Sequence, residues 1–113
     1  MIKELFICGK ARMRSPTAAD LAAKWPGITT DFAGLSHDGD KKLSAEQLLW
    51  ADLICVMETR QTKRLRQLFP GPLHDKRIVT LNIPDRFAYN DPALIALLEP
   101  KLRVLLATNP AQA

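Results

Sequence analysis

The chain has 113 residues, 47% of them hydrophobic, and a formal net charge of +4. This length suits one compact domain over residues 1–113, and the hydrophobic content supplies a core, which excludes a disordered chain. No run approaches the roughly 20 apolar residues that cross a bilayer, and the first residues lack the apolar stretch of a signal peptide. We therefore expect a cytoplasmic protein without a membrane partner, and the positive charge favours anionic ligands.

The cysteine and histidine positions argue against a metal centre. Cys8 and Cys55 both lie in or at the end of apolar runs, as reduced thiols do in a reducing compartment. Two cysteines without a CxxC pair or paired histidines do not form a zinc site. The spacing of His37, Asp38 and Asp40 fits no calcium loop. The sequence therefore predicts neither a metal ion nor an organic cofactor.

The first strand and helix are expected on either side of a short basic loop. The apolar run at residues 5–8 indicates a buried strand, and residues 9–14 form the loop. Ser15 is the expected N-cap and Pro16 the first residue of the helix, which the Pro26-Gly27 pair ends. The buried stripe of this helix is predicted to contain Ala18, Leu21, Ala22 and Trp25.

Three more strands and helices follow. Strands are expected near residues 29–32, 53–57 and 77–81. Ser44 and Gln47 have the spacing of a capping box that opens a short helix. A basic helix is expected over residues 59–69, and Pro92 opens a final helix that Pro100 kinks or splits. Residues 108–113 are expected to form a flexible tail. The inner faces of these two helices are predicted to carry Leu65, Leu68 and Phe69, and Leu94, Ile95, Leu98, Leu102, Leu105 and Leu106.

This alternation implies an α/β fold. We expect a four-stranded parallel sheet flanked by helices on both faces. Ligands of such folds bind beyond the carboxyl ends of the strands. Two loops, residues 9–14 and 83–91, follow strands and therefore lie at that edge.

The loop after the first strand carries the clearest chemical pattern. Cys8 is followed by five residues and then by Arg14 and Ser15. Backbone N–H groups of such a loop can surround a tetrahedral anion, and the next helix points its positive end at the same place. Arg14 supplies a planar fork for two phosphate oxygens. The predicted cradle between them consists of Gly9, Lys10, Ala11, Arg12 and Met13.

The same positive surroundings favour a thiolate at Cys8. The hydroxyl of Ser15 can donate a hydrogen bond to that sulfur. A thiolate placed below the phosphorus atom attacks it, which gives a phosphocysteine that water later hydrolyses. The pattern therefore predicts a cysteine-dependent phosphatase with a phosphate-binding loop between the first strand and the first helix.

This segment resembles the signature loop of the low-molecular-weight protein tyrosine phosphatases. The similarity continues through residues 33–36, 51–58 and 83–85 and covers most of the chain. It implies that Asp85 is the general acid that protonates the leaving oxygen and then activates water, and that Phe87 and Tyr89 wall the pocket. It also implies a phosphorylated protein or small aryl phosphate as substrate, with inorganic phosphate or other oxyanions binding in the loop.

The loop departs from the family at three positions. Lys10 and Ala11 stand where the family has glycine and asparagine, and Met13 stands where many members have a second cysteine. The chain is also shorter than typical members. These departures leave two non-catalytic alternatives open, a phosphate- or phosphoprotein-binding module and a phosphocysteine carrier. Arsenate reduction is a weaker alternative, because it needs additional cysteines and Cys55 is the only other one.

Several residues have simpler interpretations beside the catalytic ones. Cys8 can be a core cysteine, Arg14 a solvated loop arginine and Asp85 a turn residue. Asp91 competes with Asp85 as the acid, although its position before Pro92 is typical of a helix cap. The basic run at residues 60–66 reads as a solvated helix face rather than a nucleic-acid site, because no aromatic residues are interleaved with it.

Overall fold

The computed structural model describes residues 2–9, 14–36, 41–71, 73 and 76–108. Several expectations therefore lie outside the described residues: the middle of the cysteine loop, the His37–Asp40 segment and the last five residues of the tail. The elements in chain order are β1 (Ile2–Cys8), α1 (Arg14–Ala22), β2 (Ile28–Gly34), α2 (Ala45–Trp50), β3 (Leu53–Val56), α3 (Thr59–Leu68), β4 (Arg77–Thr80) and α4 (Pro92–Thr108).

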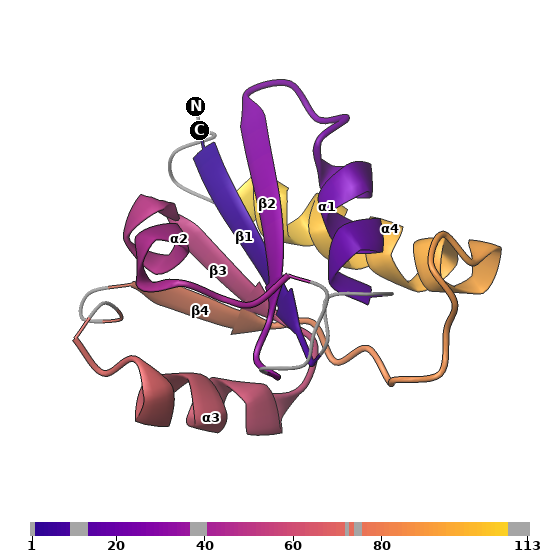
Figure 1. Cartoon of the computed structure of the whole chain (residues 1–113). Helices are drawn as coiled ribbons and strands as arrows, with labels where there is room; N and C mark the ends of the chain where they lie inside the picture. Colours follow the sequence, from indigo (N-terminus) through magenta and orange to yellow (C-terminus); the bar gives the residue numbers. More distant parts are fainter. Residues whose placement is uncertain (1, 10–13, 37–40, 72, 74–75, 109–113) are drawn as a thin grey trace.

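The four strands form one parallel sheet in the order β2-β1-β3-β4 (Figure 1). The chain leaves β1 toward β2 on one side and then crosses over to β3 on the other. In such sheets the carboxyl ends of the two strands where the order reverses, here β1 and β3, flank the usual ligand crevice. Cys8 ends β1, so the predicted nucleophile lies at this crevice.

Helices cover both faces of the sheet, as the sequence predicts. Phe6 and Cys8 of β1 pack in one core with buried residues of α1 and α4. Leu5 and Ile7 point the other way, into a second core that includes Leu48 of α2 and Leu65 of α3. Because successive strand side chains alternate between faces, a strand covered on both sides is apolar throughout. This explains the uninterrupted run at residues 5–8.

The capping box predicted for α2 is confirmed. The backbone N–H of Gln47 donates to the Ser44 hydroxyl at 3.2 Å, and the backbone N–H of Ser44 donates to Gln47 Oε1 at 3.1 Å. These two bonds satisfy N–H groups that the first turn of a helix otherwise leaves without partners.

Three expectations about the helices are corrected. α1 begins at Arg14, so Ser15 is a helical residue rather than the N-cap, a difference within the usual uncertainty of helix ends. Leu68 is 42% exposed, because its side chain borders a surface hollow instead of the core. α4 continues through Pro100 without splitting. Pro100 lies on the exposed side of the helix, where water can reach the carbonyl that loses its hydrogen bond.

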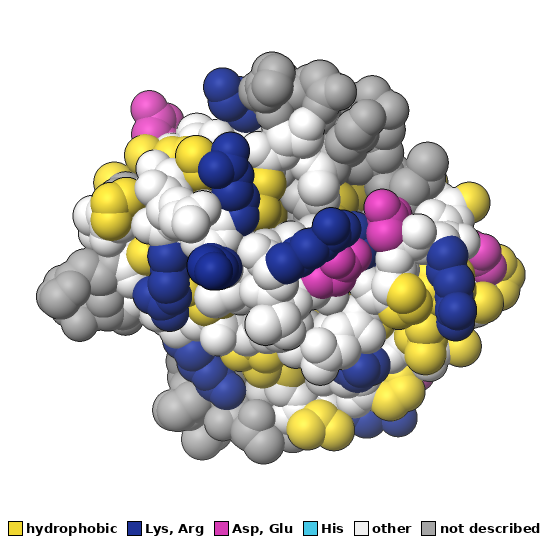
Figure 2. All heavy atoms as spheres, turned by 90° about the horizontal axis from the view of Figure 1, so that it is seen from below, with side chains coloured by type: hydrophobic (Ala, Val, Ile, Leu, Met, Phe, Trp, Pro, Cys, Tyr) yellow, Lys and Arg dark blue, Asp and Glu magenta, His cyan; other side chains and the backbone are white. Residues whose placement is uncertain are grey.

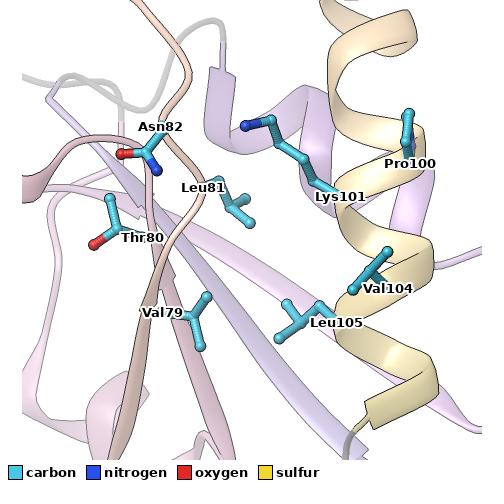
Figure 3. A pocket seen from close by; sticks show the side chains of 8 residues that line it. All are labelled: Val79, Thr80, Leu81, Asn82, Pro100, Lys101, Val104 and Leu105. Atoms are coloured by element: carbon cyan, nitrogen blue, oxygen red, sulfur yellow. The ribbon is translucent and has the colours of Figure 1, made fainter.

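An apolar hollow of about 450 Å³ lies between the edge strand β4 and α4. Figure 3 shows Val79 and Leu81 on one side of it and Val104 and Leu105 on the other. Within the described part of the chain, no helix is long and apolar enough to cross a membrane.

Candidate active site

The site is built around Cys8 and the first turn of α1. Cys8 Sγ lies 3.0 Å from the hydroxyl oxygen of Ser15, and both side chains are buried. Cys8 is the last residue of β1, and Ser15 is the second residue of α1. The contact between Cys8 and Ser15 therefore places the sulfur next to the positive N-terminal end of α1.

Arg14 is buried at the same place. Its side chain is only 3% exposed, and its Nη1 donates to Glu58 Oε1 at 2.6 Å and to the carbonyl oxygen of Ile83 at 2.7 Å. A guanidinium away from water needs such partners, since an unpaired buried charge costs several kcal/mol. Both partners contact the same nitrogen, so the edge formed by Nε and Nη2 can offer two parallel donors to an oxyanion.

Main-chain hydrogen bonds beyond the strand ends hold the carbonyl of Ile83 in place. The N–H of Leu81 donates to the carbonyl of Val56, and the N–H of Ile83 donates to the carbonyl of Met57, each at 2.9 Å. The pairing of β3 with β4 thus continues past their assigned ends. Arg14 is consequently held by two segments that follow β3 and β4, both far from α1 in the sequence.

Glu58 connects Arg14 to α3. Its second oxygen accepts a hydrogen bond from Arg60 Nε at 2.6 Å. Burial by itself raises the pKa of Glu58, but the hydrogen bonds from Arg14 and Arg60 together outweigh it and hold that pKa below its usual range. The carboxyl group is therefore a carboxylate that orients both arginines.

The other side of the site is made by the end of β2. The N–H of Leu35 donates to the carbonyl of Cys8 at 2.9 Å, and the N–H of Ser36 donates to the carbonyl of Gly9 at 2.7 Å. These bonds fix the first part of the predicted phosphate loop. The remaining cradle residues, Lys10, Ala11, Arg12 and Met13, lie outside the described residues.

Asp85 and Asp91, the two candidates for the general acid, have different surroundings in the structure. Asp85 Oδ1 lies 3.7 Å from Arg14 Nε, and its side chain is 66% exposed. Asp91 precedes α4 instead, where its carboxylate accepts a hydrogen bond from the N–H of Ala93 at 2.9 Å and its carbonyl accepts one from Ile95. Asp91 therefore acts as a helix cap, and Asp85 is the aspartate that lies beside Arg14.

The loop that carries Asp85 is attached to α1. The N–H of Asn90 donates to the Thr17 hydroxyl at 2.9 Å, and the Tyr89 hydroxyl donates to the carboxylate of Asp20. Asn82 and Asn90 begin and end the loop, each with φ of 58°. Asparagine tolerates this left-handed conformation better than most residues.

The two predicted aromatic wall residues differ in their surroundings. Phe87 is half-buried against the core under α1 and α4, with the Arg86 guanidinium 5.3 Å from the centre of its ring. Tyr89 is 47% exposed, and its contact with Asp20 directs it toward α1. Their role as pocket walls stays a prediction.

Sequence reasoning missed the residues that hold Arg14. Glu58 and Ile83 are separated from Arg14 by 44 and 69 positions. Their positions in the sequence could have indicated this role. Both residues follow predicted strands and therefore lie at the carboxyl edge of the sheet, where Glu58 supplies an acidic side chain.

No protein-family model and no curated protein sequence matches this chain. Several solved structures, however, are similar to it. The YwlE arginine phosphatase from Geobacillus stearothermophilus superimposes with a TM-score of 0.74 at 21% identity, covering 93% of this chain and 90% of that one. The tyrosine phosphatase Wzb from Escherichia coli K30, in complex with phosphate, gives 0.76 at 20% identity, covering 93% and 96%.

The low molecular weight protein tyrosine phosphatase SP-PTP from Streptococcus pyogenes gives a TM-score of 0.78 at 16% identity, covering 95% of this chain and 92% of that one. The chain has the low-molecular-weight phosphatase fold. The fold expected from the sequence resemblance is thereby confirmed over nearly the whole length of the chain. At these identities the similarity concerns the fold and not the activity.

Proposed function

We propose that this chain is a cysteine-dependent phosphomonoester hydrolase that acts on phosphotyrosine or another aryl phosphate. The observation that carries the proposal is the meeting of Cys8 Sγ, the Ser15 hydroxyl and the buried Arg14 at the start of α1. A nucleophilic sulfur, a hydroxyl donor and a cation at a helix N-terminus are the groups that phosphoryl transfer through cysteine requires. The fold shared with enzymes described as tyrosine and arginine phosphatases supports it.

In the first step, the Cys8 thiolate attacks the phosphorus atom of the bound ester. The S–P bond forms as the P–O bond to the alcohol breaks, and Asp85 transfers its proton to the departing oxygen. The hydroxyl of Ser15 stabilises the thiolate before attack. The Nε and Nη2 edge of Arg14 holds two of the phosphoryl oxygens as their charge redistributes.

In the second step, water attacks the phosphocysteine. Asp85, now a carboxylate, accepts a proton from this water, the S–P bond breaks and inorganic phosphate leaves. Its high exposure suits this role, because the acid must reach both the leaving group and solvent. No metal ion or organic cofactor takes part in either step.

The non-catalytic alternatives share the oxyanion site and differ in turnover. A binding module would hold phosphate without hydrolysis, and a carrier would keep the phosphate on Cys8 for transfer. Arsenate reduction is disfavoured by the surroundings of Cys55, which is fully buried in the sheet. Burial and the nearby Glu4 raise the pKa of the Cys55 thiol, which makes it a poor nucleophile.

The first experiment is hydrolysis of para-nitrophenyl phosphate in the presence of EDTA by wild type, Cys8→Ser and Cys55→Ala. We expect metal-independent turnover that Cys8→Ser abolishes and Cys55→Ala retains. Equal activity in Cys8→Ser would eliminate the thiolate mechanism. An inactive wild type that still binds vanadate would identify a binding module instead. A phosphotyrosine peptide and phosphoarginine, assayed in parallel, distinguish the two substrate classes of the structural relatives.

A further inference from the structure

A second cavity borders the candidate active site on the α3 side. It measures about 370 Å³ and is lined by Gly9, Leu35, Ser36, Arg60, Gln61 and Arg64. Gly9 directly follows Cys8, so the cavity begins next to the proposed nucleophile. Its other walls come from the end of β2 and from α3, whereas Asp85 follows β4. No residue of the loop that carries Asp85 is among the described residues that line the cavity.

Positive charge dominates this cavity. Arg60 and Arg64 are four residues apart on α3, a spacing that places both on one face of the helix. No acidic side chain is among the described residues that line it. On the face of the molecule that includes α3, Lys and Arg side chains are scattered among uncharged ones, and acidic side chains appear in fewer places (Figure 2).

Both arginines can still bind an anion. Arg60 is 76% exposed and uses its Nε for Glu58, which leaves other N–H groups of its fork for a second acceptor. Gln61 is almost fully buried, with its Oε1 accepting hydrogen bonds from the N–H groups of Met57 and Glu58 at 2.8 and 2.9 Å. The floor of the cavity is therefore fixed by the main chain, and its rim is cationic.

We propose that Arg60 and Arg64 form a specificity subsite for an acidic side chain next to the phosphorylated residue of a peptide substrate. This inference rests on the proposed phosphatase function and names its substrate class. When the phosphate occupies the site at Cys8, a peptide residue that passes over Gly9 toward α3 enters this cavity. A carboxylate on the α3 side meets two guanidinium groups, while a neutral side chain leaves them in water. A nucleic acid fits less well, because no aromatic residue is among the described residues that line this cavity and could stack on a base.

The test compares two phosphotyrosine peptides that differ only in having glutamate or glutamine beside the phosphotyrosine. We measure kcat/KM for both with wild type, Arg64→Gln, Arg60→Gln and the control Arg66→Gln, an exposed arginine of α3 that does not line the cavity. The ratio of the two values cancels any effect of a substitution on the chemistry itself. This correction matters most for Arg60→Gln, because Arg60 binds Glu58 and Glu58 in turn binds Arg14.

We expect wild type to favour the glutamate peptide by about 3- to 10-fold, since exposed ion pairs are worth roughly 0.2–1 kcal/mol each. Arg64→Gln and Arg60→Gln should each lower this ratio toward 1, Arg66→Gln should leave it unchanged, and salt should reduce it. A wild-type ratio near 1, or an equal loss in Arg66→Gln, overturns the subsite while leaving the phosphatase intact.

If neither peptide is hydrolysed, the proposed phosphatase function fails, and the subsite is judged by binding. The dissociation constants of the same two peptides, labelled for fluorescence anisotropy, should differ by the same factor and respond to the same variants. Equal dissociation constants overturn the subsite. Binding of single-stranded DNA that Arg64→Gln abolishes, without any difference between the peptides, assigns these arginines to nucleic acid instead.

Discussion

At the scale of single residues, the two aspartates near the site are distinguished by what each contacts. Asp85 lies beside Arg14, with Oδ1 3.7 Å from Nε, and Asp91 caps α4. The sequence leaves both open as the general acid, because each follows a strand in a loop. Only the folded arrangement brings Asp85 within 3.7 Å of Arg14 Nε, while Asp91 binds the first turn of α4.

This difference predicts how Asp85→Asn affects catalysis. Loss of a general acid should slow phenyl phosphate about 10²- to 10⁴-fold and para-nitrophenyl phosphate much less, because nitrophenolate leaves without a proton. Steady-state kinetics on both esters gives the comparison. Asp91→Asn is the control, since asparagine also caps helices well. An equal loss on both esters would mean that Asp85 acts only by orienting Arg14.

A second prediction concerns the carboxylate that orients Arg14. Glu58→Gln keeps the shape of the side chain but removes the charge that Arg14 and Arg60 share. Hydrogen bonds to charged groups contribute about 1.5–3 kcal/mol, so kcat/KM should fall roughly 10- to 100-fold. Glu99→Gln, which breaks the exposed pair with Arg103, should leave kinetics unchanged. Wild-type kinetics in Glu58→Gln would show that Ile83 suffices to hold the arginine.

At the scale of elements, β1 carries a buried acid that the proposed chemistry does not use. Glu4 is fully buried on the face that α1 and α4 cover, and its Oε2 has no hydrogen-bond partner among the described residues. Burial raises its pKa from 4.5 to about 7, opposed in part by a weak hydrogen bond from the Cys55 thiol at 3.8 Å. The fold therefore prefers the protonated carboxyl group.

This preference makes stability depend on pH. Because the pKa is raised in the folded state, the protonated acid causes no penalty below pH 4.5, and stability is lost progressively as pH rises from there through about 7. Above pH 7, the folded state has lost roughly 3 kcal/mol of its free energy of unfolding through this group. We expect urea unfolding at pH 5, 7 and 9 to show Glu4→Gln gaining stability relative to wild type as pH rises.

The control for this experiment is Glu46→Gln, which changes an exposed acid in the first turn of α2. Its difference from wild type should vary little between pH 5 and 9. A stability difference for Glu4→Gln that is also constant over this range would mean that the buried carboxyl group does not change its protonation there.

At the scale of the whole molecule, the parallel sheet decides which loops meet. The order β2-β1-β3-β4 places the ends of β1 and β3 side by side, with β2 and β4 outside them. Arg14 therefore contacts Glu58 and Ile83, which follow β3 and β4, while Gly9 accepts a hydrogen bond from Ser36, which follows β2. Four separate stretches of sequence form the site because parallel strands present all their carboxyl ends at one edge.

Local sequence signals predict most of the helices and strands, and they also predict the reactive motif. Local signals are enough for these: the apolar run at residues 5–8 marks a strand covered on both faces, Ser44 and Gln47 mark a helix start, and Cys8 with Arg14 and Ser15 marks an oxyanion loop. Errors arose where tertiary surroundings override such signals, as at Leu68, which borders a hollow, and at Pro100, which α4 tolerates on its exposed side.

The groups that surround Arg14 depend on the packing of the whole fold. Its partners lie 44 and 69 residues away, and no local pattern encodes a contact at that distance. The choice between Asp85 and Asp91 and the cavity lined by Arg60 and Arg64 depend in the same way on how loops from different strands pack. The physical reason is that hydrophobic periodicity and capping act within a few residues, whereas the packing of both sheet faces brings distant loops together.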